Sequence, residues 1–216
     1  RIARINRDPS NFRFFKDVAF KYGLSQCLKW DTPEYIAKLQ DHGYNILLEG
    51  TQGSGLSLLH GIYPYVTSID TNAAQILAEC GIAPSRLSNV LLVARTYPIR
   101  VAGNSGPLQG ELTWDQMSEM MGERMEERTT VTKKVRRIGM WDDELFRRAM
   151  VLNQPSSVAI TFMDYIDPRV KGADTRDQMT DMAWAFVNRI IREFGVRVSM
   201  VGTGGPTCSM IKLAAY

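Results

Sequence analysis

The sequence contains little cysteine and little histidine, and both shortages narrow its possible functions. Its three cysteines, Cys27, Cys80 and Cys208, lie far apart in 216 residues, so they form neither a disulfide framework nor a metal-binding motif. With only two histidines, His42 and His60, a histidine-based metal site is not expected. This use of cysteine fits a reducing compartment, and we expect a cytoplasmic protein.

Long apolar runs, strong charge of one sign and the common catalytic motifs are absent as well. No apolar run approaches the roughly 20 residues that a membrane span needs, so no membrane partner is expected. The net charge of +3 is too small to argue for nucleic acid as a partner. The sequence has no G-x-x-x-x-G-K-[ST] phosphate loop. It also has no defensible arrangement of Ser, His and Asp, or of Cys and His, for nucleophilic catalysis.

The length allows one α/β core or two small ones, and 44% hydrophobic and 23% charged residues are ordinary for a globular domain. The first residue is Arg1 rather than Met, so we expect a portion of a longer protein. We divide the chain into a helical segment at residues 1–45 (a cap or dimer region), an α/β core at residues 46–211, and a vector-derived tail at residues 212–216.

Helix and strand signals alternate along the chain. Apolar periodicity and capping residues predict helices at residues 11–22, 32–41 and 72–80, from residue 113 for about two turns, and at residues 142–152 and 175–194. Apolar runs predict strands at residues 45–49, 89–95, 157–164 and 196–201, with the first run buried and the second buried on both faces. This alternation indicates the α/β class, with a mostly parallel central sheet flanked by helices.

Polar or glycine-rich residues follow every predicted strand. They lie at residues 49–52, residues 95–100, Asp164 and residues 202–205. Ligands of parallel sheets bind beyond the carboxyl ends of the strands, so we expect these four segments to border one small-molecule crevice.

Several side chains suggest what this crevice binds. Gln52 can donate and accept hydrogen bonds at once, which suits an amide-like edge such as that of a 6-oxopurine. Asp164 is either an acceptor for a base or the cap of a turn. The threonine-rich run at residues 129–132 is either a clamp for a carboxylate or an exposed strand. The basic cluster at residues 133–137 is either an anion site or a solvated helix face.

Six segments together resemble the adenylosuccinate synthetase family. The family pattern E-G-(A/T)-Q-G occurs at residues 49–53, and H-G-x-Y-P-Y-V-T-S at residues 60–68. An R-V-x-x-x-x-G-P stretch follows at residues 100–107, and a T-T…R-R-x-G-x-W loop at residues 129–141. The family's T-K-L-D and terminal G-P turn correspond to residues 161–164 and 202–206.

The resemblance implies a C–N ligase. Such an enzyme joins L-aspartate to the 6-oxo carbon of a purine nucleoside monophosphate, with a nucleoside triphosphate (ATP or GTP) as phosphoryl donor and Mg²⁺ as cofactor. The implied binding residues are Gln52, Gly53, Thr67, Val101, Lys134 and Arg4 for the monophosphate, Thr129, Thr130, Thr132 and Arg136 for aspartate, and Phe162, Asp164, Gly202 and Gly204 for the donor base. Arg4 would reach the monophosphate of a neighbouring subunit, which implies a homodimer.

Three departures from the family pattern modify this expectation. The family's phosphate loop and its catalytic Asp and His would precede Arg1, so we expect residues 1–216 alone to be inactive. Phe162 replaces the family's base-reading Lys, which makes ATP a plausible donor. The segment lengths favour the short branch that includes the phage 2-aminoadenylosuccinate synthases, which use (d)GMP. The alternatives are an ordinary enzyme acting on IMP with GTP, a non-catalytic purine-nucleotide-binding module, and a nucleic-acid-binding domain.

Overall fold

The computed structural model describes residue 17, residues 20–23 and residues 31–213 of the chain. The chain forms two compact units: residues 1–51 with residues 72–87, and residues 52–71 with residues 88–216. None of the described helices is long and apolar enough to cross a membrane. Arg4, Cys27 and most of the helix predicted at residues 11–22 lie outside the described residues.

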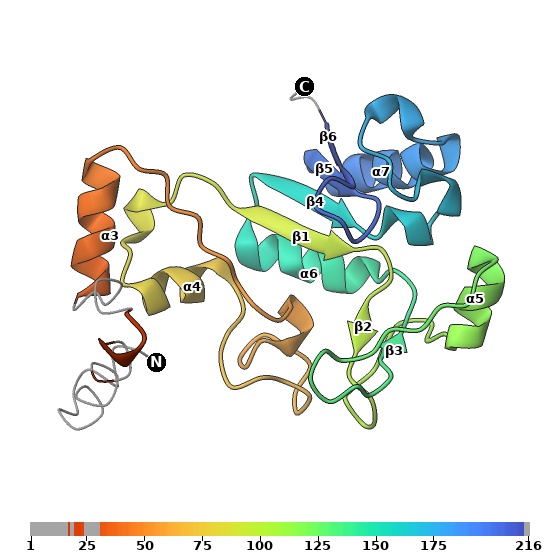
Figure 1. Ribbon diagram of the computed structural model, residues 1–216, viewed down its shortest axis with the longest axis horizontal. Helices are drawn as coiled ribbons and strands as arrows, with labels where there is room; N and C mark the ends of the chain where they lie inside the picture. Colours follow the sequence, from red (N-terminus) through yellow and green to blue (C-terminus); the bar gives the residue numbers. More distant parts are fainter. Residues whose placement is uncertain (1–16, 18–19, 24–30, 214–216) are drawn as a thin grey trace. The chain divides into compact units, whose positions relative to one another are not determined.

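The larger unit is built on a four-stranded sheet (Figure 1). Its strands are β1 (Leu91–Arg95), β4 (Ser157–Thr161), β5 (Val198–Gly202) and β6 (Met210–Lys212), and this is also their order across the sheet. β1, β4 and β5 run parallel, whereas β6 is antiparallel to β5. The predicted α/β class with a mostly parallel sheet is confirmed.

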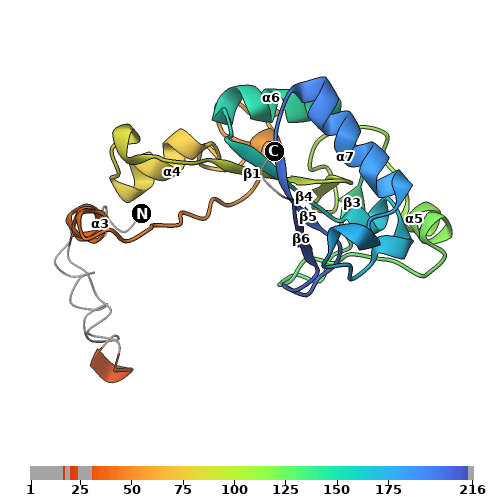
Figure 2. The same cartoon turned by 90° about the horizontal axis from the view of Figure 1, so that it is seen from above.

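Two helices, α6 (Asp143–Asn153) and α7 (Asp181–Phe194), pack together on one face of this sheet (Figure 2). The ring centroids of Phe146 in α6 and Phe194 in α7 are 4.8 Å apart. The core beneath them consists of fully buried aliphatic side chains from the strands and α7, namely Val158, Ile160, Val201, Val187 and Ile190. The apolar stripe predicted for α7 thus belongs to the core, apart from Met182, which is 53% exposed.

β1 is not buried on both faces, and that prediction was wrong. Leu92 and Ala94 pack against the core, but Leu91 and Val93 on the opposite face are 42% and 63% exposed. Among the strands that the structure describes, β1 lies at one edge of the sheet. The two helices therefore bury only those β1 side chains that lie on the helix-covered face of the sheet. A continuous apolar run in the sequence does not show that the other face is exposed.

A second, smaller core adjoins the sheet. β2 (Ile99–Arg100) pairs antiparallel with β3 (Arg137–Ile138), and α5 (Trp114–Met121) packs beside them. Ile138 and Met117 are fully buried there. Figure 1 shows α5, β2 and β3 close to the end of β1.

Helix starts follow the predicted caps with one exception. α5 opens with the predicted capping box of Thr113 and Gln116. The box of Thr175 and Gln178 is present but opens a short 3-10 helix, and α7 starts later, capped by Thr180. The 3-10 helices are η2 (Ser54–Leu56), η3 (Pro84–Arg86), η4 (Met163–Tyr165), η5 (Pro168–Val170) and η6 (Arg176–Gln178).

The smaller unit contains α3 (Thr32–Asp41) and α4 (Ala73–Cys80), both close to their predicted bounds. The strand predicted at residues 45–49 is wrong: this segment is neither helix nor strand, and Leu47 is 93% exposed. A strand requires a neighbouring strand to pair its backbone groups. Among the described residues, no strand pairs with this segment.

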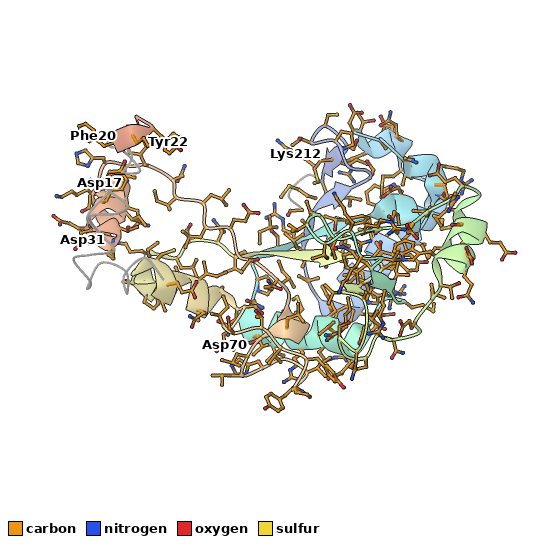
Figure 3. The ribbon with its side chains drawn as sticks, turned by 60° about the horizontal axis from the view of Figure 1, so that its bottom comes forward. Asp17, Phe20, Tyr22, Asp31, Asp70 and Lys212 are labelled. Carbon is orange, nitrogen blue, oxygen red and sulfur yellow. The ribbon has the colours of Figure 1, made fainter. Side chains whose placement is uncertain are left out.

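The C-terminal residues that we set aside from the fold take part in it. Lys212, labelled in Figure 3, is the last residue of β6. The Leu213 N–H donates to the Ser199 carbonyl at 2.9 Å, and the Leu213 side chain is 6% exposed. Strand pairing with β5 thus continues through Lys212, although we excluded residues 212–216 from the expected fold.

Candidate functional site

Residues 52–71 fold into one loop, in which hydrogen bonds link Gly53, next to Gln52, to Thr67 through Leu56. The Leu56 N–H donates to the Gly53 carbonyl at 2.8 Å, and the Thr67 N–H donates to the Leu56 carbonyl at 2.8 Å. Gln52 has a φ of 70° and is exposed, while Thr67 is half-buried. Gly53, at the end of the first sequence motif, is therefore linked to Thr67, in the second motif, within one loop.

A tight turn at residues 57–61 fixes the shape of this loop. The Gly61 N–H donates to the Ser57 carbonyl at 2.8 Å, and the Ile62 N–H donates to the Gly55 carbonyl at 3.0 Å. Asp70, labelled in Figure 3, accepts from the Ser57 hydroxyl at 2.6 Å and from the Leu59 N–H at 2.9 Å. The hydrogen bonds from Ser57 and then Leu59 lower the pKa of the Asp70 carboxyl.

We expect this turn to depend on pH. A carboxyl whose pKa is lowered in the folded state stabilises it above the unfolded pKa of about 3.9, and this contribution is lost as pH falls through the lower folded pKa. The Leu59 amide proton should therefore keep its chemical shift down to about pH 4 and change below it. Asp70→Asn should remove that acid transition, which an NMR titration can check. An unaltered transition in Asp70→Asn would assign it to another group.

A second loop, residues 100–107, packs against the first. Arg100 is 9% exposed, and its Nη1 donates to the carbonyl of Ser105 at 2.5 Å and of Tyr65 at 3.5 Å. A Cβ on Gly106 would lie 2.8 Å from the Tyr65 Cβ. Val101, next to this buried arginine, is 55% exposed, and its carbonyl accepts from the Ser105 hydroxyl at 2.5 Å.

Arg137 locks the second loop in place. It pairs with both carboxylate oxygens of Glu111 at 2.5 and 2.6 Å and also donates to the Gly106 carbonyl at 2.8 Å. The hydrogen bond to Glu111 raises the pKa of Arg137, whereas burial and the neighbouring Arg137 lower the pKa of Arg100. Arg137, from the basic cluster, therefore has a structural partner and is not a free anion site.

The threonines that are predicted to bind the substrate aspartate lie on a tight turn, which is neither an exposed strand nor a helix face. The Thr129 N–H donates to the Lys134 carbonyl at 2.9 Å, and the Lys134 N–H donates to the Thr129 hydroxyl at 3.0 Å. The hydroxyls of Thr129 and Thr132 lie 2.6 Å apart. Thr130, Thr132 and Lys134 are exposed on this turn.

Arg136 joins this turn to the loop that carries Val101. Arg100 pairs with Arg137 in the β2–β3 ladder, so Val101 and Arg136 are the next residues at the same end of the ladder. The Arg136 carbonyl accepts from the Trp114 indole N–H at 2.6 Å, which anchors this position on α5. Val101, predicted to bind the monophosphate, and Arg136, predicted to bind aspartate, thus lie on adjoining segments.

The predicted base-binding residues gather beyond the carboxyl ends of β4 and β5. Gly202, at the end of β5, is so close to β4 that its Cβ would lie 3.5 Å from the Thr161 Cα. The Asp164 Oδ1 is buried without a hydrogen-bond partner in the described part of the chain. Burial raises the pKa of this carboxyl, and the cations Lys171 and Arg95 oppose that rise.

The turn after β5 is fixed by hydrogen bonds between Thr203 and residues 172–173. The Gly172 N–H donates to the Thr203 carbonyl at 3.0 Å, and the fully buried Thr203 hydroxyl donates to the Ala173 carbonyl at 2.6 Å. A Cβ on Gly204 would lie 3.7 Å from the Gly172 nitrogen. Gly204 therefore lies in a fixed turn beside the β4 end.

Arg95, at the end of β1, was predicted only as part of the strand-end segment at residues 95–100 and was given no role of its own. Its guanidinium carbon lies 3.6 Å from the centroid of the Phe162 ring, and its Nη atoms contact both carboxylate oxygens of Glu127, one of them at 3.2 Å. The position of Arg95 at a strand end was the available signal. Glu127 gave no local signal, because it lies 32 residues away in the chain.

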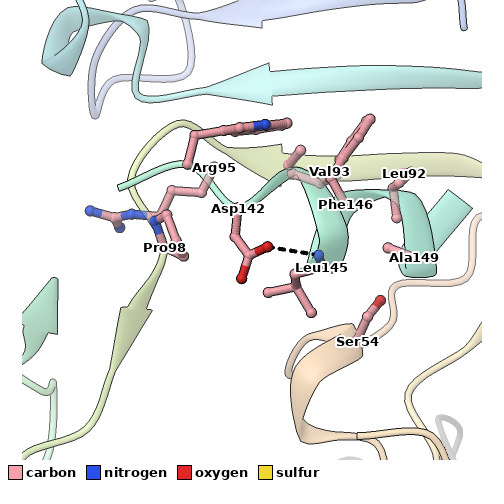
Figure 4. A pocket seen from close by; sticks show the side chains of 11 residues that line it. Ser54, Leu92, Val93, Arg95, Pro98, Asp142, Leu145, Phe146 and Ala149 are labelled. Carbon is pink, nitrogen blue, oxygen red and sulfur yellow. Dashed lines mark hydrogen bonds between the residues drawn. The ribbon is translucent and has the colours of Figure 1, made fainter. Parts of the chain in front are cut away.

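A cavity of about 150 Å³ lies between β1 and the start of α6 (Figure 4). Its lining includes Leu92, Arg95, Leu145, Phe146 and Ser54. The Asp142 carboxylate at its edge accepts from the Leu145 N–H at 2.9 Å. None of the described residues predicted to bind a ligand lines this cavity. The loop that carries Gln52 borders it only through Ser54.

Comparison with known proteins identifies the family. The family model described as adenylosuccinate synthetase matches residues 17–171. The chain belongs to the adenylosuccinate synthetase family. A curated adenylosuccinate synthetase of Methanococcus maripaludis strain C7 is 38% identical over 202 residues, which are 94% of this chain and 57% of the relative. One from Archaeoglobus fulgidus is 36% identical over 183 residues, covering 85% and 53% of the two chains. The chain therefore spans about half the length of these relatives.

Two solved structures extend this comparison. The fully ligated adenylosuccinate synthetase of Plasmodium falciparum gives a TM-score of 0.79 at 19% identity, over 95% of this chain and 58% of the other, which shows a shared fold. The succinoaminodeoxyadenylate synthetase of cyanophage S-2L, bound to dGMP and dATP, gives a TM-score of 0.63 at 30% identity, over 77% and 46%.

The described residues of this family member do not fit a metal site of their own. Among them, no group of three or more His, Cys, Asp or Glu side chains could hold a metal ion. Mg²⁺ stays a prediction from the family resemblance, and none of the roles proposed below depends on it.

Proposed function

We propose that the protein to which this chain belongs is a nucleoside-triphosphate-dependent ligase. It joins L-aspartate to the 6-oxo carbon of a purine nucleoside monophosphate, with (d)GMP preferred and 2-amino-(deoxy)adenylosuccinate as product. The observation that supports the proposal is the single loop at residues 52–71, which carries both Gln52 and Thr67, links Gly53 to Thr67 through Leu56, and packs against the loop of Val101.

The overall reaction proceeds in two transfers. The donor's terminal phosphoryl group passes to the purine O6, which leaves a nucleoside diphosphate. The aspartate amine then forms a bond to C6, the C6–O6 bond breaks, and O6 departs with inorganic phosphate. We assign no catalytic residue to this chain, in which the proposed roles are binding and orientation.

Gln52 suits the purine in this scheme. Its side-chain amide is both donor and acceptor, which matches the N1–H and O6 edge of a 6-oxopurine. Gln52 is exposed at the start of its loop, and the hydroxyl of Thr67 and the backbone of Val101 complete this part of the site in our proposal.

Aspartate would bind on the turn at residues 129–134 and beside Arg136. Exposed hydroxyls of Thr130 and Thr132 offer donors of the kind that carboxylates accept, and Lys134, which we assign to the monophosphate, lies on the same turn. Arg136 adds a guanidinium, which can pair with a carboxylate through two parallel hydrogen bonds.

The donor base would lie at the ends of β4 and β5. Phe162 offers an aromatic ring instead of an ammonium, and the unpartnered Asp164 Oδ1 can accept from an exocyclic amine. Because Asp164 can accept from the exocyclic amine of adenine or of guanine, the choice of base rests on Phe162, and we propose ATP. The solved phage synthetase, bound to dGMP and dATP, supports both nucleotide choices.

The alternative is an adenylosuccinate synthetase acting on IMP with GTP. The 36–38% identity to curated adenylosuccinate synthetases of archaea favours it. From the resemblance we also propose a homodimer, in which Arg4 reaches the monophosphate of the neighbouring subunit, and a cytoplasmic location.

A substrate matrix tests these proposals. The natural gene product would be assayed with IMP, GMP and dGMP, each with ATP and with GTP, in the presence of L-aspartate. We expect the highest kcat/KM with GMP or dGMP, and turnover with ATP at least equal to that with GTP. Strict dependence on GTP would refute the role of Phe162. Nucleotide binding without turnover would identify a non-catalytic module, and steeply salt-dependent DNA binding would identify a nucleic-acid-binding domain.

A further inference from the structure

Arg95 is held by a set of contacts that leaves its guanidinium almost no freedom. Its Nε donates to the Tyr97 carbonyl at 2.5 Å, and its two Nη atoms pair with the two carboxylate oxygens of Glu127. The side chains of Arg95 and Glu127 are only 17% and 22% exposed. A two-pronged, largely desolvated pair of this kind fixes geometry far better than a surface ion pair does.

The face of this fixed guanidinium supports Phe162. The 3.6 Å separation of the Arg95 guanidinium carbon and the Phe162 ring centroid is a stacking distance. Phe162 has a φ of 61°, which is unusual for a bulky residue, and its carbonyl accepts from the Thr96 hydroxyl at 2.6 Å. Such backbone strain persists only where the surroundings hold it, and it is concentrated at functional positions.

Glu127 connects the same pair to the turn at residues 129–134. Its carbonyl accepts from the Arg136 N–H at 2.8 Å, and the neighbouring Arg128 pairs with Val135 to close the turn. Its Oε1 also accepts from the Tyr165 hydroxyl at 2.9 Å, and the ring of Tyr165 meets that of Phe162 edge-on with centroids 5.1 Å apart. Glu127 therefore contacts both Arg95, which stacks on Phe162, and the base of the turn at residues 129–134.

We propose that Arg95 and Glu127 are positioning residues that hold the donor-base platform at Phe162 and the aspartate-binding turn at residues 129–134 in register with each other. The proposal rests on the proposed function of these two segments. Neither residue touches a reacting atom in this scheme. Their effect is exerted on two of the three substrates, while Gln52 and Thr67 are held by a separate set of hydrogen bonds.

Two conservative variants test the pair in the natural gene product. Arg95→Lys keeps the charge but loses the planar stack and the two-pronged contact. Glu127→Gln keeps the shape but places an amide N–H₂ against the guanidinium donors. We expect each variant to raise the KM for the triphosphate and for aspartate about ten-fold, with the KM for the monophosphate within about two-fold of wild type.

The matched control is Arg189→Lys. Arg189 is 29% exposed and pairs with Asp143 and Glu193 on α6 and α7, without contact to Phe162 or the turn. Arg189→Lys should leave the KM values for the triphosphate, aspartate and the monophosphate within about two-fold of wild type. A milder variant, Tyr165→Phe, removes only the hydroxyl contact to Glu127, and should raise the KM for the triphosphate and for aspartate about three-fold even if the stronger variants fold poorly.

Calorimetry with a non-hydrolysable ATP analogue separates this proposal from the proposed function. Absence of wild-type turnover with every monophosphate would refute the ligase, while ten-fold weaker analogue binding in Arg95→Lys would still support the platform. An equal rise of all three KM values would indicate a general structural role and overturn the proposal. Unchanged values for the triphosphate and aspartate, or unchanged analogue binding, would overturn it as well.

Discussion

Gly61→Ala is expected to lower kcat/KM for the purine monophosphate by about 1,000-fold or more, the largest single effect that the structure predicts. A Cβ on Gly61 would lie 2.3 Å from the Ser57 carbonyl oxygen and 2.8 Å from both the Gly55 carbonyl oxygen and the Ser57 nitrogen. All three are backbone atoms of the same loop, so no side-chain rotation can relieve the overlap. The loop at residues 52–71 has to open.

Opening that loop separates the residues proposed to bind the purine. The hydrogen bonds from Gly61 to Ser57 and from Ile62 to Gly55 are the first to be lost, and they lie between Gln52 and Thr67 in the chain. Overpacking of this kind costs about 1–3 kcal/mol of stability, so the rest of the fold should survive. Activity should therefore fall much further than the thermal midpoint of unfolding.

The matched control is Leu59→Ala, two residues earlier in the same turn. The Leu59 side chain is 74% exposed, and its truncation keeps the Cβ and the backbone hydrogen bond to Asp70. Steady-state kinetics and thermal unfolding of both variants should show a near-normal Leu59→Ala and a folded but inactive Gly61→Ala. A Gly61→Ala enzyme with wild-type KM for the monophosphate would remove this loop from the proposed site.

Features that depend on neighbouring residues in the chain could be predicted from the sequence. The α4 helix begins after Asn72 and ends at Gly81, whose φ of 69° suits glycine. The capping box of Thr113 and Gln116 opens α5 as expected. In both cases the stabilising groups lie within four residues of the helix end, so a local pattern contains the whole cause.

Features that depend on distant partners could not be predicted. The run at residues 45–49 has the composition of a buried strand, but no described strand pairs with it. β1 was given two buried faces, although an edge strand beneath two helices buries one. Lys212 and Leu213 were set aside, although their pairing with β5 makes them part of the sheet.

The candidate site also combines residues with local sequence signals and residues whose contacts come from distant parts of the chain. Gln52 and Thr67 lie in dense local motifs and were predicted as ligand-binding residues, a prediction that stays open; the structure places both on one loop, in which hydrogen bonds link Gly53 to Thr67 through Leu56. The Arg95–Glu127 pair spans 32 residues, and the contact of Arg95 with Phe162 joins the ends of two different strands. Parallel neighbours are brought together only by the sheet, so no spacing in the sequence reports such contacts.

Gln52→Asn is expected to lower kcat/KM for the purine monophosphate about 100-fold, with little change in stability. Asn tolerates a positive φ at least as well as Gln, so the φ of 70° at this position can be kept. The amide is retained but retracts by one carbon–carbon bond, which takes it out of hydrogen-bond range of a bound 6-oxopurine. The loss of two hydrogen bonds, each worth about 1–1.5 kcal/mol, corresponds to a decrease of about 100-fold in kcat/KM.

The chain supplies a close control for this substitution. Gln154 is also an exposed glutamine with a positive φ, 40°, at the end of α6 and away from the proposed site. Gln154→Asn should leave kcat/KM within about two-fold of wild type, which separates the chemistry of the amide at position 52 from the general cost of the substitution. Measurement of the KM for the triphosphate sharpens the test. If Gln52 reads the purine of the monophosphate, Gln52→Asn should raise the KM for the monophosphate and leave the KM for the triphosphate within about two-fold of wild type. An equal rise of both KM values would show that Gln52 supports the loop without reading the base.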